Sequence, residues 1–461
     1  MSTPAPTSPT GHGGPAGASR LPTATRRVIL ANSLSALGNG FTLPFLVIYL
    51  HEVRGLSLVL VGVVVATTAV VGLFAGPVAG ALIDSLGARR MLLAALAAAT
   101  VGSLVLADVH SAWQAFVAAG LMGLAGSTLW SGISALVAFT TPPELRQRAF
   151  GVEFQLLNAG IGIGGICGGL LADTGRPSTF VLLYVVDAAS YVVCGLVLLS
   201  LRGLGRPSAP EPADAEASGP GGYREVLGDR TFVRLCGLTF LAAACGYVQL
   251  EAGFPAFARG YAEVSTFVIG VAFAVNTLVI VLAQMLVLRY LHGRRRNHVL
   301  ALVGVIWSAA WLITGAAGLL PGTVTASVLV GFSLGVFALG ETLWQPTSST
   351  LLNELAPPHL RGRYNALGGL MWQSAGVVGP PVAGALLGAG LAVWWVALVV
   401  LGMLAYAAGA LRIGRILTPA QNGVGALAAG AGPHEPIVPG RGETTASPGL
   451  DADPAPVGHE R

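Results

Sequence analysis

The sequence contains no lysine, so all 25 of its basic residues are arginine. Charged residues make up only 10% of the 461 residues, against about 25% in soluble domains. Hydrophobic residues make up 54% of the chain, and the mean hydropathy is +0.72. A soluble protein with this composition would lack the polar side chains to cover its surface. The composition therefore excludes an ordinary soluble domain and indicates a lipid bilayer as the solvent.

Cysteine and the motifs of enzymes are also scarce. The four cysteines, Cys167, Cys194, Cys236 and Cys245, lie in apolar segments at spacings that match neither a disulfide framework nor a metal site. We find no zinc-type histidine spacing, no nucleophile elbow and no phosphate-binding loop. The net charge of +4 is small and does not indicate a nucleic-acid partner. We therefore expect a protein that is not an enzyme and has no cofactor or metal.

Apolar runs of membrane-spanning length occur twelve times. A spanning helix needs roughly 20 apolar residues, because its backbone groups must find their hydrogen bonds within the segment. The runs lie near residues 28–50, 58–80, 91–107, 113–139, 149–172, 180–200, 231–254, 264–288, 299–320, 323–350, 364–388 and 391–411. They predict an all-α membrane protein with twelve transmembrane helices.

Polar segments divide the chain into five parts. We expect a disordered N-terminus over residues 1–25 and a first six-helix bundle over 26–200. A linker of Pro, Ala, Ser and acidic residues follows over 201–230. A second bundle over 231–415 and a disordered tail over 416–461 complete the chain. Segments of this polar composition bury too little apolar surface to offset the entropy of ordering them.

The arginines predict how the chain lies in the membrane. With twelve spans, both termini are on one side, together with the loops that follow every even-numbered span. These segments hold 22 of the 25 arginines, and the other side holds only Arg54, Arg176 and Arg259. Because positive loops stay in the cytoplasm, we expect a multi-pass plasma-membrane protein with both termini cytoplasmic.

The two halves of the sequence repeat each other. The segment PPELRQR, from Pro142 to Arg148, returns as PPHLRGR 215 residues later. At the same offset, Asn158 corresponds to Gln373 and Gly164 corresponds to Gly379. The chain is therefore predicted to use one six-helix unit twice. In such parallel repeats the substrate site lies near the membrane midplane, between the two halves.

A short charged loop interrupts the apolar sequence between the second and third spans. In GALIDSLGARR, the residues Gly80, Leu82, Asp84, Gly87, Arg89 and Arg90 match the pattern Gly-x-Leu-x-Asp-x-x-Gly-x-Arg-Arg. With twelve spans and a 6+6 repeat, this loop resembles that of the major facilitator superfamily, over about residues 26–417. The resemblance implies a secondary transporter that binds a small-molecule substrate and protons, sits in the lipid bilayer and is a monomer.

Two interpretations of this loop remain open. In the superfamily, the matching aspartate contacts the start of the eleventh helix and locks the cytoplasmic side, so Asp84 is expected near Arg361 and Arg363. Gly80 and Gly87 would allow the close approach, and an acid is favourable at the positive start of a helix. The alternative is a topological anchor, in which Asp84, Arg89 and Arg90 simply stay among the lipid headgroups.

The fifth span carries a run of glycines, GIGIGGICGG. Gly160, Gly164 and Gly168 recur every four residues, and Gly165 and Gly169 lie beside them. Such small-residue stripes let two membrane helices approach closely. The run resembles the antiporter signature of the superfamily, with Gly165 in place of its proline, and Gly379 and Pro380 form a partial copy in the eleventh span. The resemblance implies export, whereas the alternative is close packing alone.

Acids inside the spans are candidates for proton coupling, since an ionisable residue at membrane depth costs roughly 2.5–3.5 kcal/mol. Glu341 lies near the middle of the tenth span. Trp344, Gln345 and Ser348 follow at +3, +4 and +7, so all share one helix face. This face is suited to a proton or a cationic organic substrate, or Glu341 is a buried hydrogen-bond partner.

Two further acids leave the same choice open. Asp187, in the sixth span, either couples protons or bonds to Ser190 or a neighbouring helix. Glu153, in the fifth span, either couples protons or stabilises the helix start or pairs with a loop arginine. Ala119 and Met122 replace the arginine and glutamine that proton-coupled exporters of the superfamily often carry in the fourth span.

Neutral polar residues and tryptophans on the spans that line the cavity in this superfamily are candidates for substrate contact. They are Asn32, Asn39, Gln155, Asn158, Gln249, Asn276, Trp344, Gln345, Trp372 and Gln373. The function that these features favour is proton-coupled export of small lipophilic or cationic organic compounds, of the multidrug-efflux type. The alternatives are a nutrient or metabolite uptake symporter and, less well supported, a membrane sensor without transport.

Overall fold

The computed structural model describes residues 21–201, 223–291 and 293–424, and within these ranges all regular structure is helical. Twelve helical segments of the described residues are long and apolar enough to cross a membrane. The predicted fold class, an all-α membrane protein with twelve spans, is confirmed. The predicted terminal segments and the linker fall largely outside the described residues.

The first six spans comprise the N-terminal half. The first span is irregular and consists of α1 (Thr23–Thr42), η1 (Leu43–Phe45), α2 (Leu46–Ile48) and η2 (Tyr49–Val53). Pro44 lies in η1 and lacks an N–H group to donate, which explains why the α-helix is interrupted there. The next five spans are α3 (Leu58–Leu86), α4 (Ala88–Ala107), α5 (Ala112–Thr140), α6 (Pro143–Leu171) and α7 (Pro177–Ser200).

The last six spans comprise the C-terminal half. Its first span is α10 (Arg230–Cys245) with η3 (Tyr247–Leu250), and the short helices α9 (Tyr223–Gly228) and α11 (Gly253–Gly260) flank it. The other spans are α12 (Thr266–Leu291), α13 (Arg296–Ala317), α14 (Val324–Leu355), α15 (Arg361–Gly388) and α16 (Ala392–Ile413), with η4 (Pro358–Leu360) ahead of α15.

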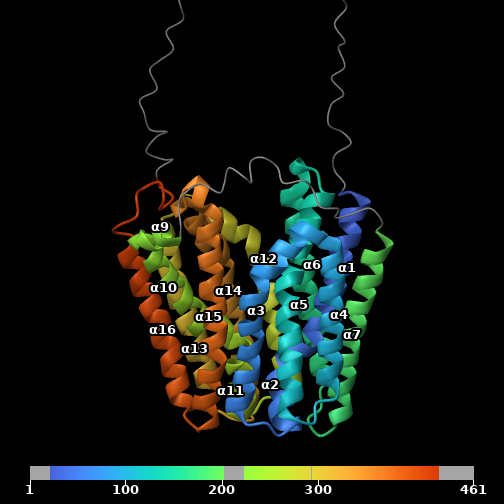
Figure 1. Cartoon of the computed structure of the whole chain (residues 1–461). Helices are drawn as coiled ribbons and strands as arrows, with labels where there is room; N and C mark the ends of the chain where they lie inside the picture. Colours follow the sequence, from blue (N-terminus) through green and yellow to red (C-terminus); the bar gives the residue numbers. More distant parts are fainter. Residues whose placement is uncertain (1–20, 202–222, 292, 425–461) are drawn as a thin grey trace, which may run out of the picture.

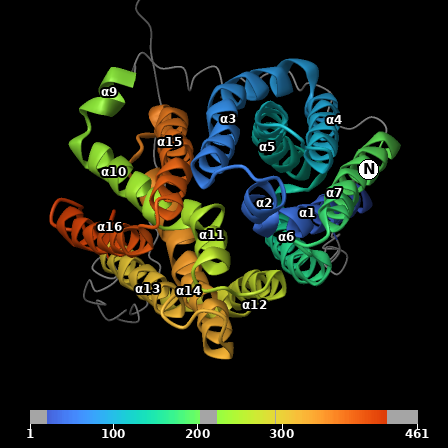
Figure 2. The same cartoon turned by 90° about the horizontal axis from the view of Figure 1, so that it is seen from below.

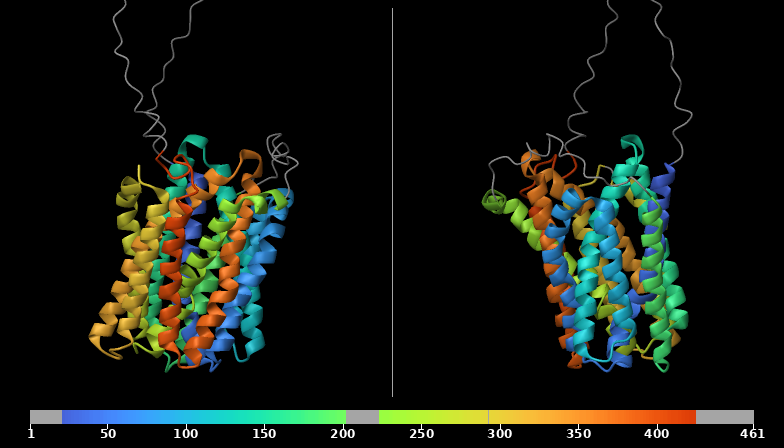
Figure 3. Two further views of the ribbon diagram at one scale, coloured as in Figure 1. Left: turned by 90° about the vertical axis from the view of Figure 1, so that its left-hand side faces the viewer. Right: turned by 45° about the vertical axis from the view of Figure 1, so that its right-hand side comes forward.

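The two halves stand side by side and meet along two helix pairs. Helix α3 packs against α15, and α6 packs against α12 (Figure 2). Helix α1 begins and α16 ends at the same end of the molecule, the top in Figure 1, which we call the terminal side. The other end is called the opposite side. The side views show that both halves run the full distance between these two sides (Figure 3).

Glycines allow the two halves to approach closely on the opposite side. A Cβ atom at Gly384 of α15 would overlap the carbonyl oxygen of Leu58 in α3, and one at Gly62 would overlap that of Pro380. The glycines of α6 contact two helices. Gly160, Gly164 and Gly168 face the backbone of α1, whereas Gly165 and Gly169 face α12. The stripe therefore packs one helix against both its own half and the other half.

On the terminal side, the facing surfaces of α3 and α15 are separated. Gly72 of α3 still lies against Gln373 of α15. Gly76 and Gly80 follow on the same face of α3, yet a Cβ atom at either would meet nothing within 4 Å. The same holds for Gly369 and Gly362 of α15. The halves are therefore closed on the opposite side and separated on the terminal side.

Candidate functional site

An ion pair and several hydrogen bonds close the opposite side across the two halves. Nε of Arg259 donates to both carboxylate oxygens of Glu52, at 2.9 and 3.1 Å. The guanidinium also donates to the carbonyl oxygen of Val264 at 3.2 Å and to Thr174 Oγ1 at 3.4 Å. Arg259 and Glu52 are 29% and 26% exposed. Arg259 thus bridges the C-terminal half to two segments of the N-terminal half.

A tyrosine adds a contact within the closed side. The hydroxyl of Tyr261 donates to the carbonyl oxygen of Leu387 at 2.5 Å. Desolvation by burial raises the pKa of Tyr261, so this hydroxyl stays a proton donor at neutral pH. A crevice of about 370 Å³ lined by Glu52, Arg259 and Tyr261 marks the seam between the halves here.

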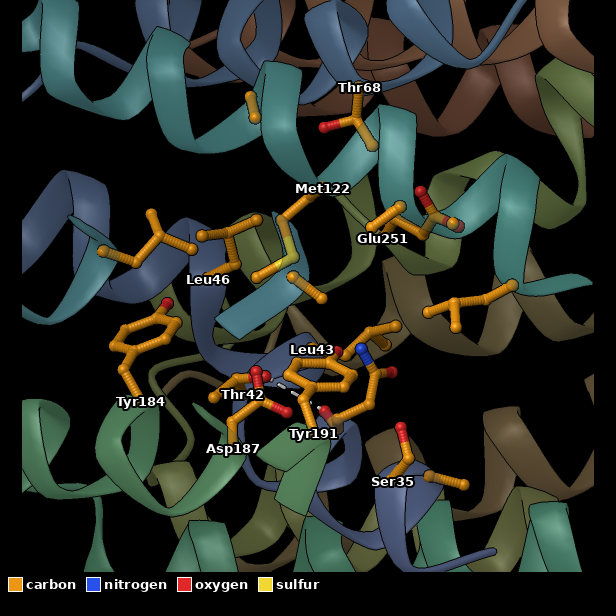
Figure 4. A pocket seen from close by; sticks show the side chains of 18 of the residues that line it. Ser35, Thr42, Leu43, Leu46, Thr68, Met122, Tyr184, Asp187, Tyr191 and Glu251 are labelled. Atoms are coloured by element: carbon orange, nitrogen blue, oxygen red, sulfur yellow. Dashed lines mark hydrogen bonds between the residues drawn. The ribbon is translucent and has the colours of Figure 1, made fainter. Parts of the chain in front are cut away.

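A cavity of about 370 Å³ lies inside the N-terminal half. Its walls come from α1, α3, α4, α5, α6 and α7, with Glu251 contributed by the other half. The size falls in the range of about 300–1,000 Å³ that is typical of small-molecule sites. Most lining side chains are aliphatic, including Leu43, Leu46 and Met122 (Figure 4). The cavity is therefore suited to an apolar molecule with few polar groups.

Asp187 is the buried acid of this cavity. It is 1% exposed, and Ser103 Oγ of α4 donates to its Oδ2 at 2.8 Å. Its second carboxylate oxygen, Oδ1, is buried and has no hydrogen-bond partner among the described residues. Ser190 was predicted as a partner of the Asp187 side chain. Its Oγ instead donates to the backbone carbonyl oxygen of Asp187, at 2.7 Å. The carboxyl group thus has Ser103 and the Tyr191 hydroxyl as polar partners, while its Oδ1 lies outside hydrogen-bond distance of any described donor.

Two tyrosines lie on the same face of α7 as Asp187. Tyr184 precedes it by three residues and Tyr191 follows by four, and all three line the cavity (Figure 4). The hydroxyl of Tyr191 interacts with the side chains of Asp187 and Asn39. The hydroxyl of Tyr184 is buried without a partner among the described residues. Two polar atoms of one helix face therefore lack partners beside the cavity.

The charges that line the cavity are all negative. Glu251 is exposed to it from the C-terminal half (Figure 4). Among the described lining residues there is no arginine or histidine. Arg54 lies beyond Tyr49, where its Nε donates to the Tyr49 hydroxyl at 2.8 Å and its Nη2 to the carbonyl oxygen of Ala107 at 3.3 Å. The cavity thus favours a cationic over an anionic guest.

Two of the predicted substrate contacts, Asn32 and Asn39, line this cavity. Asn32 also connects it to the predicted coupling residue Glu153, because Asn32 Nδ2 donates to Glu153 Oε1 at 2.9 Å. Glu153 is half-buried, and its carboxylate accepts this hydrogen bond from α1. An acid and an amide of adjacent helices therefore form one edge of the site.

Glu341 lies in a second polar cluster, inside the C-terminal half. It is 9% exposed. Tyr247 hydrogen-bonds to its carboxylate, and Asn276 Nδ2 lies 3.5 Å from its Oε2. Among the described residues it forms no ion pair. Spans 7, 8 and 10 thus bring together an acid, an amide and a phenol.

Aromatic rings surround this second cluster. The ring of Trp344 lies 5.6 Å from that of Trp372 and 5.9 Å from that of Trp307. Tyr247 lies 4.8 Å from Trp372. Trp344 is 4% exposed. Both Glu341 and Trp344 therefore face the interior of the bundle, away from the lipid.

The remaining predicted contacts have other surroundings. Gln249 is buried, donates to the carbonyl oxygen of Ala244 at 2.7 Å and accepts from Trp395 Nε1 at 2.9 Å. Asn158 donates to the carbonyl oxygen of Phe154 in its own helix, at 2.9 Å. Gln373 lies at the α3–α15 contact, and Gln155 and Gln345 are exposed. None of these five lines the described cavity.

The charged loop between α3 and α4 contacts its own half. Arg89 donates from Nε to the carbonyl oxygen of Leu198 at 2.9 Å and from Nη2 to that of Leu199 at 2.8 Å. Gly87 has φ of +90°, which a glycine adopts without strain, and Arg90 is exposed. The side chain of Asp84 lies outside the described residues, so the predicted clasp to α15 stays a prediction.

Four residues of these two clusters, Tyr184, Tyr191, Ser103 and Tyr247, were not predicted from the sequence. For the two tyrosines a signal exists, because the spacing −3 and +4 around Asp187 places aromatic rings beside a carboxylate on one helix face. Ser103 lies 84 residues before Asp187, and only the packing of α4 against α7 reveals that pair.

Comparison with known proteins places the chain in a family. The sequence profile of the Major Facilitator Superfamily matches residues 28–380. A "Na(+), Li(+), K(+)/H(+) antiporter" of Planococcus maritimus is 24% identical over 367 residues, covering 73% of this chain and 83% of the relative. The "Multidrug resistance protein MdtH" of Aeromonas salmonicida (strain A449) is 26% identical over 362 residues, covering 77% of this chain and 86% of the relative.

A solved structure shows the same architecture. The crystal structure of the peptide transporter POT in complex with sulfate superposes with a TM-score of 0.67, covering 86% of this chain and 96% of that chain. The two sequences are 16% identical, so this likeness concerns the fold alone. Because the family profile covers most of the chain and the twelve helices form two six-helix halves, the protein belongs to the major facilitator superfamily and is a secondary active transporter.

Proposed function

We propose that this transporter is a proton-coupled exporter of small lipophilic or cationic organic compounds, acting in the plasma membrane. The terminal side would be cytoplasmic, in line with its share of arginines. The described conformation, open at the terminal side and closed on the opposite side, is then inward-facing. Two relatives support the coarse assignment, since one is named as a cation/proton antiporter and another as a multidrug resistance protein.

The observation that carries proton coupling is the setting of Glu341. A carboxylate removed from water without a cation is costly, and Glu341 has only Tyr247 and Asn276 as polar partners among the described residues. The neutral acid is therefore favoured while the cluster is dry. Hydration of the cluster in another conformation would favour loss of the proton. Glu341 can thus couple the proton to the conformation of the halves.

The transport cycle follows from the two faces of the molecule. In the inward-facing form, the substrate enters from the terminal side while the Glu52–Arg259 pair keeps the opposite side shut. Closure of α3 on α15 at the terminal side would engage the clasp of Asp84 and open the opposite side. A proton taken up there and released at the terminal side makes the cycle run in the direction of export.

The test is transport in proteoliposomes with an imposed pH gradient. We expect wild type to move the fluorescent cation ethidium against its gradient when protons flow the other way, and Glu341→Gln to lose the dependence on the pH gradient. Glu144→Gln is the matched control, because Glu144 is exposed at the start of α6. Glu153→Gln and Asp187→Asn test the two other predicted coupling acids.

Two results would contradict the proposal. Full gradient-driven transport by Glu341→Gln would exclude Glu341 as the coupling residue. Wild-type movement of the substrate in the same direction as the protons would exclude export by antiport and favour an uptake symporter.

A further inference from the structure

Two side chains that line the cavity of the N-terminal half each carry an unpartnered polar atom. Asp187 Oδ1 and Tyr184 Oη are both buried, both belong to side chains that line the cavity, and neither has a partner among the described residues. Buried polar atoms nearly always have a hydrogen-bond partner. Because both of these oxygens can accept a hydrogen bond, a donor that enters the cavity would satisfy them.

The charge and the walls of the cavity restrict what this donor is. The lining acids are Asp187 and Glu251, and no described lining residue is basic. Two aromatic faces, those of Tyr184 and Tyr191, lie on the same helix face as Asp187, and such faces attract cations. The other walls are mostly aliphatic or alanine side chains. A cation with an apolar body matches all three features.

From these contacts we propose that the Asp187 pocket is the recognition site for protonated organic amines, with the ammonium N–H groups donating to Asp187 Oδ1 and Tyr184 Oη. The apolar body of the amine then lies along α5, where Ala115, Ala119 and Met122 line the cavity. This inference rests on the proposed function and names its substrate class. It assigns Asp187 to the substrate and leaves Glu341 as the coupling residue.

An inorganic cation fits the pocket less well. Hard metal ions require six or more oxygen ligands in a compact shell. Asp187 already accepts from Ser103, and most of the cavity wall supplies no oxygen at all. The volume of about 370 Å³ is that of an organic ligand site. A sodium or potassium ion would therefore leave most of the cavity empty and most of its own ligand positions unfilled.

The experiment compares one amine with its neutral derivative. Propranolol carries a positive charge at pH 7 and N-acetylpropranolol does not, although both have the same aromatic body. Binding to the purified full-length protein in lipid nanodiscs is measured without a gradient. We expect wild type to bind the amine at least tenfold more tightly than the neutral compound. Asp187→Asn should weaken amine binding by about thirtyfold or more and change binding of the neutral compound less than twofold.

Further variants separate charge recognition from folding and packing. Tyr184→Phe keeps the ring and removes the hydroxyl, so it should weaken the amine severalfold and leave the neutral compound unchanged. Ala119→Leu fills the cavity and should weaken both compounds alike. Glu341 does not line the cavity, so Glu341→Gln should retain the preference for the amine. Elution as a single peak in size-exclusion chromatography checks that each variant is folded.

The outcomes for the site and for the function are distinct. If Asp187→Asn retains the full preference for the amine, or if the preference disappears in Glu341→Gln instead, the site is wrong. If sodium alone displaces the amine equally well from wild type and from Asp187→Asn, the proposed site is also wrong. If wild-type proteoliposomes transport neither ethidium nor propranolol, the proposed function fails, whatever the binding result.

Discussion

Removal of the ion pair that closes the opposite side should shift the protein toward its outward-facing form. Arg259 and Glu52 belong to different halves, so their contact exists only while this side is closed. The substitution Arg259→Ala removes the bifurcated hydrogen bond from Nε to Glu52 and the hydrogen bonds to Val264 and Thr174 together. It leaves the terminal side untouched.

The magnitude follows from the burial of the pair. Exposed ion pairs contribute about 0.2–1 kcal/mol, and breaking fully buried ones costs about 3–5 kcal/mol. Arg259 and Glu52 are 29% and 26% exposed, which places this pair between the two limits. We expect a loss of about 1–2 kcal/mol from the inward-facing form. This corresponds to a shift of roughly five- to thirtyfold in the equilibrium between the two forms.

The assay is the distance between spin labels on the opposite side. Labels at Ser178 and Ala389, both exposed there on different halves, are introduced after replacement of the four native cysteines. Arg259→Ala should increase the population at long distance. Arg176→Ala is the matched control, because Arg176 pairs with Asp173 inside one half. A distance distribution of Arg259→Ala equal to that of Arg176→Ala would refute the role of the ion pair.

Three further changes test the contacts between the halves. Gly384→Ala overlaps a carbonyl oxygen of α3 and should destabilise the closed opposite side by about 1–3 kcal/mol, seen as a lower Tm, whereas Gly369→Ala faces open space and should leave the Tm unchanged. Thr266→Val removes the 2.7 Å hydrogen bond to the Ala172 carbonyl oxygen and should cost about 1 kcal/mol, measured as an increase in the outward-facing population. Asp84→Asn should decrease the outward-facing population if the clasp exists, and an unchanged population would favour the topological anchor.

Much of the fold was predictable because its determinants are local. Every span must satisfy its own backbone groups in lipid, so apolar length alone located the twelve helices. The glycine run predicted a closely packed helix because glycines four residues apart lie on one face of a helix, which is also a local property of the sequence. The spacing does not show which helix packs against these glycines. Only the structure shows that Gly164 faces α1 and that Gly169 faces α12.

The site was less predictable, because it depends on which helix faces meet. Asp187 was predicted either to couple protons or to bond to Ser190 or a neighbouring helix, and the structure places it in the lining of a cavity with Asn32 and Asn39. Glu341 was predicted either to share a functional helix face with Trp344 and Gln345 or to be a buried hydrogen-bond partner, and the structure buries it against Tyr247 and leaves Gln345 exposed. Contacts between residues so distant in sequence, and the side on which the halves are open, follow from packing and not from periodicity.

The most direct test of alternating access measures both sides of one protein. A second pair of labels at Leu86 and Gly362, exposed at the terminal ends of α3 and α15, reports the other side. In Arg259→Ala, we predict that the Leu86–Gly362 distance shortens in the same fraction of molecules in which the Ser178–Ala389 distance lengthens. Lengthening on the opposite side with no change on the terminal side would contradict the account.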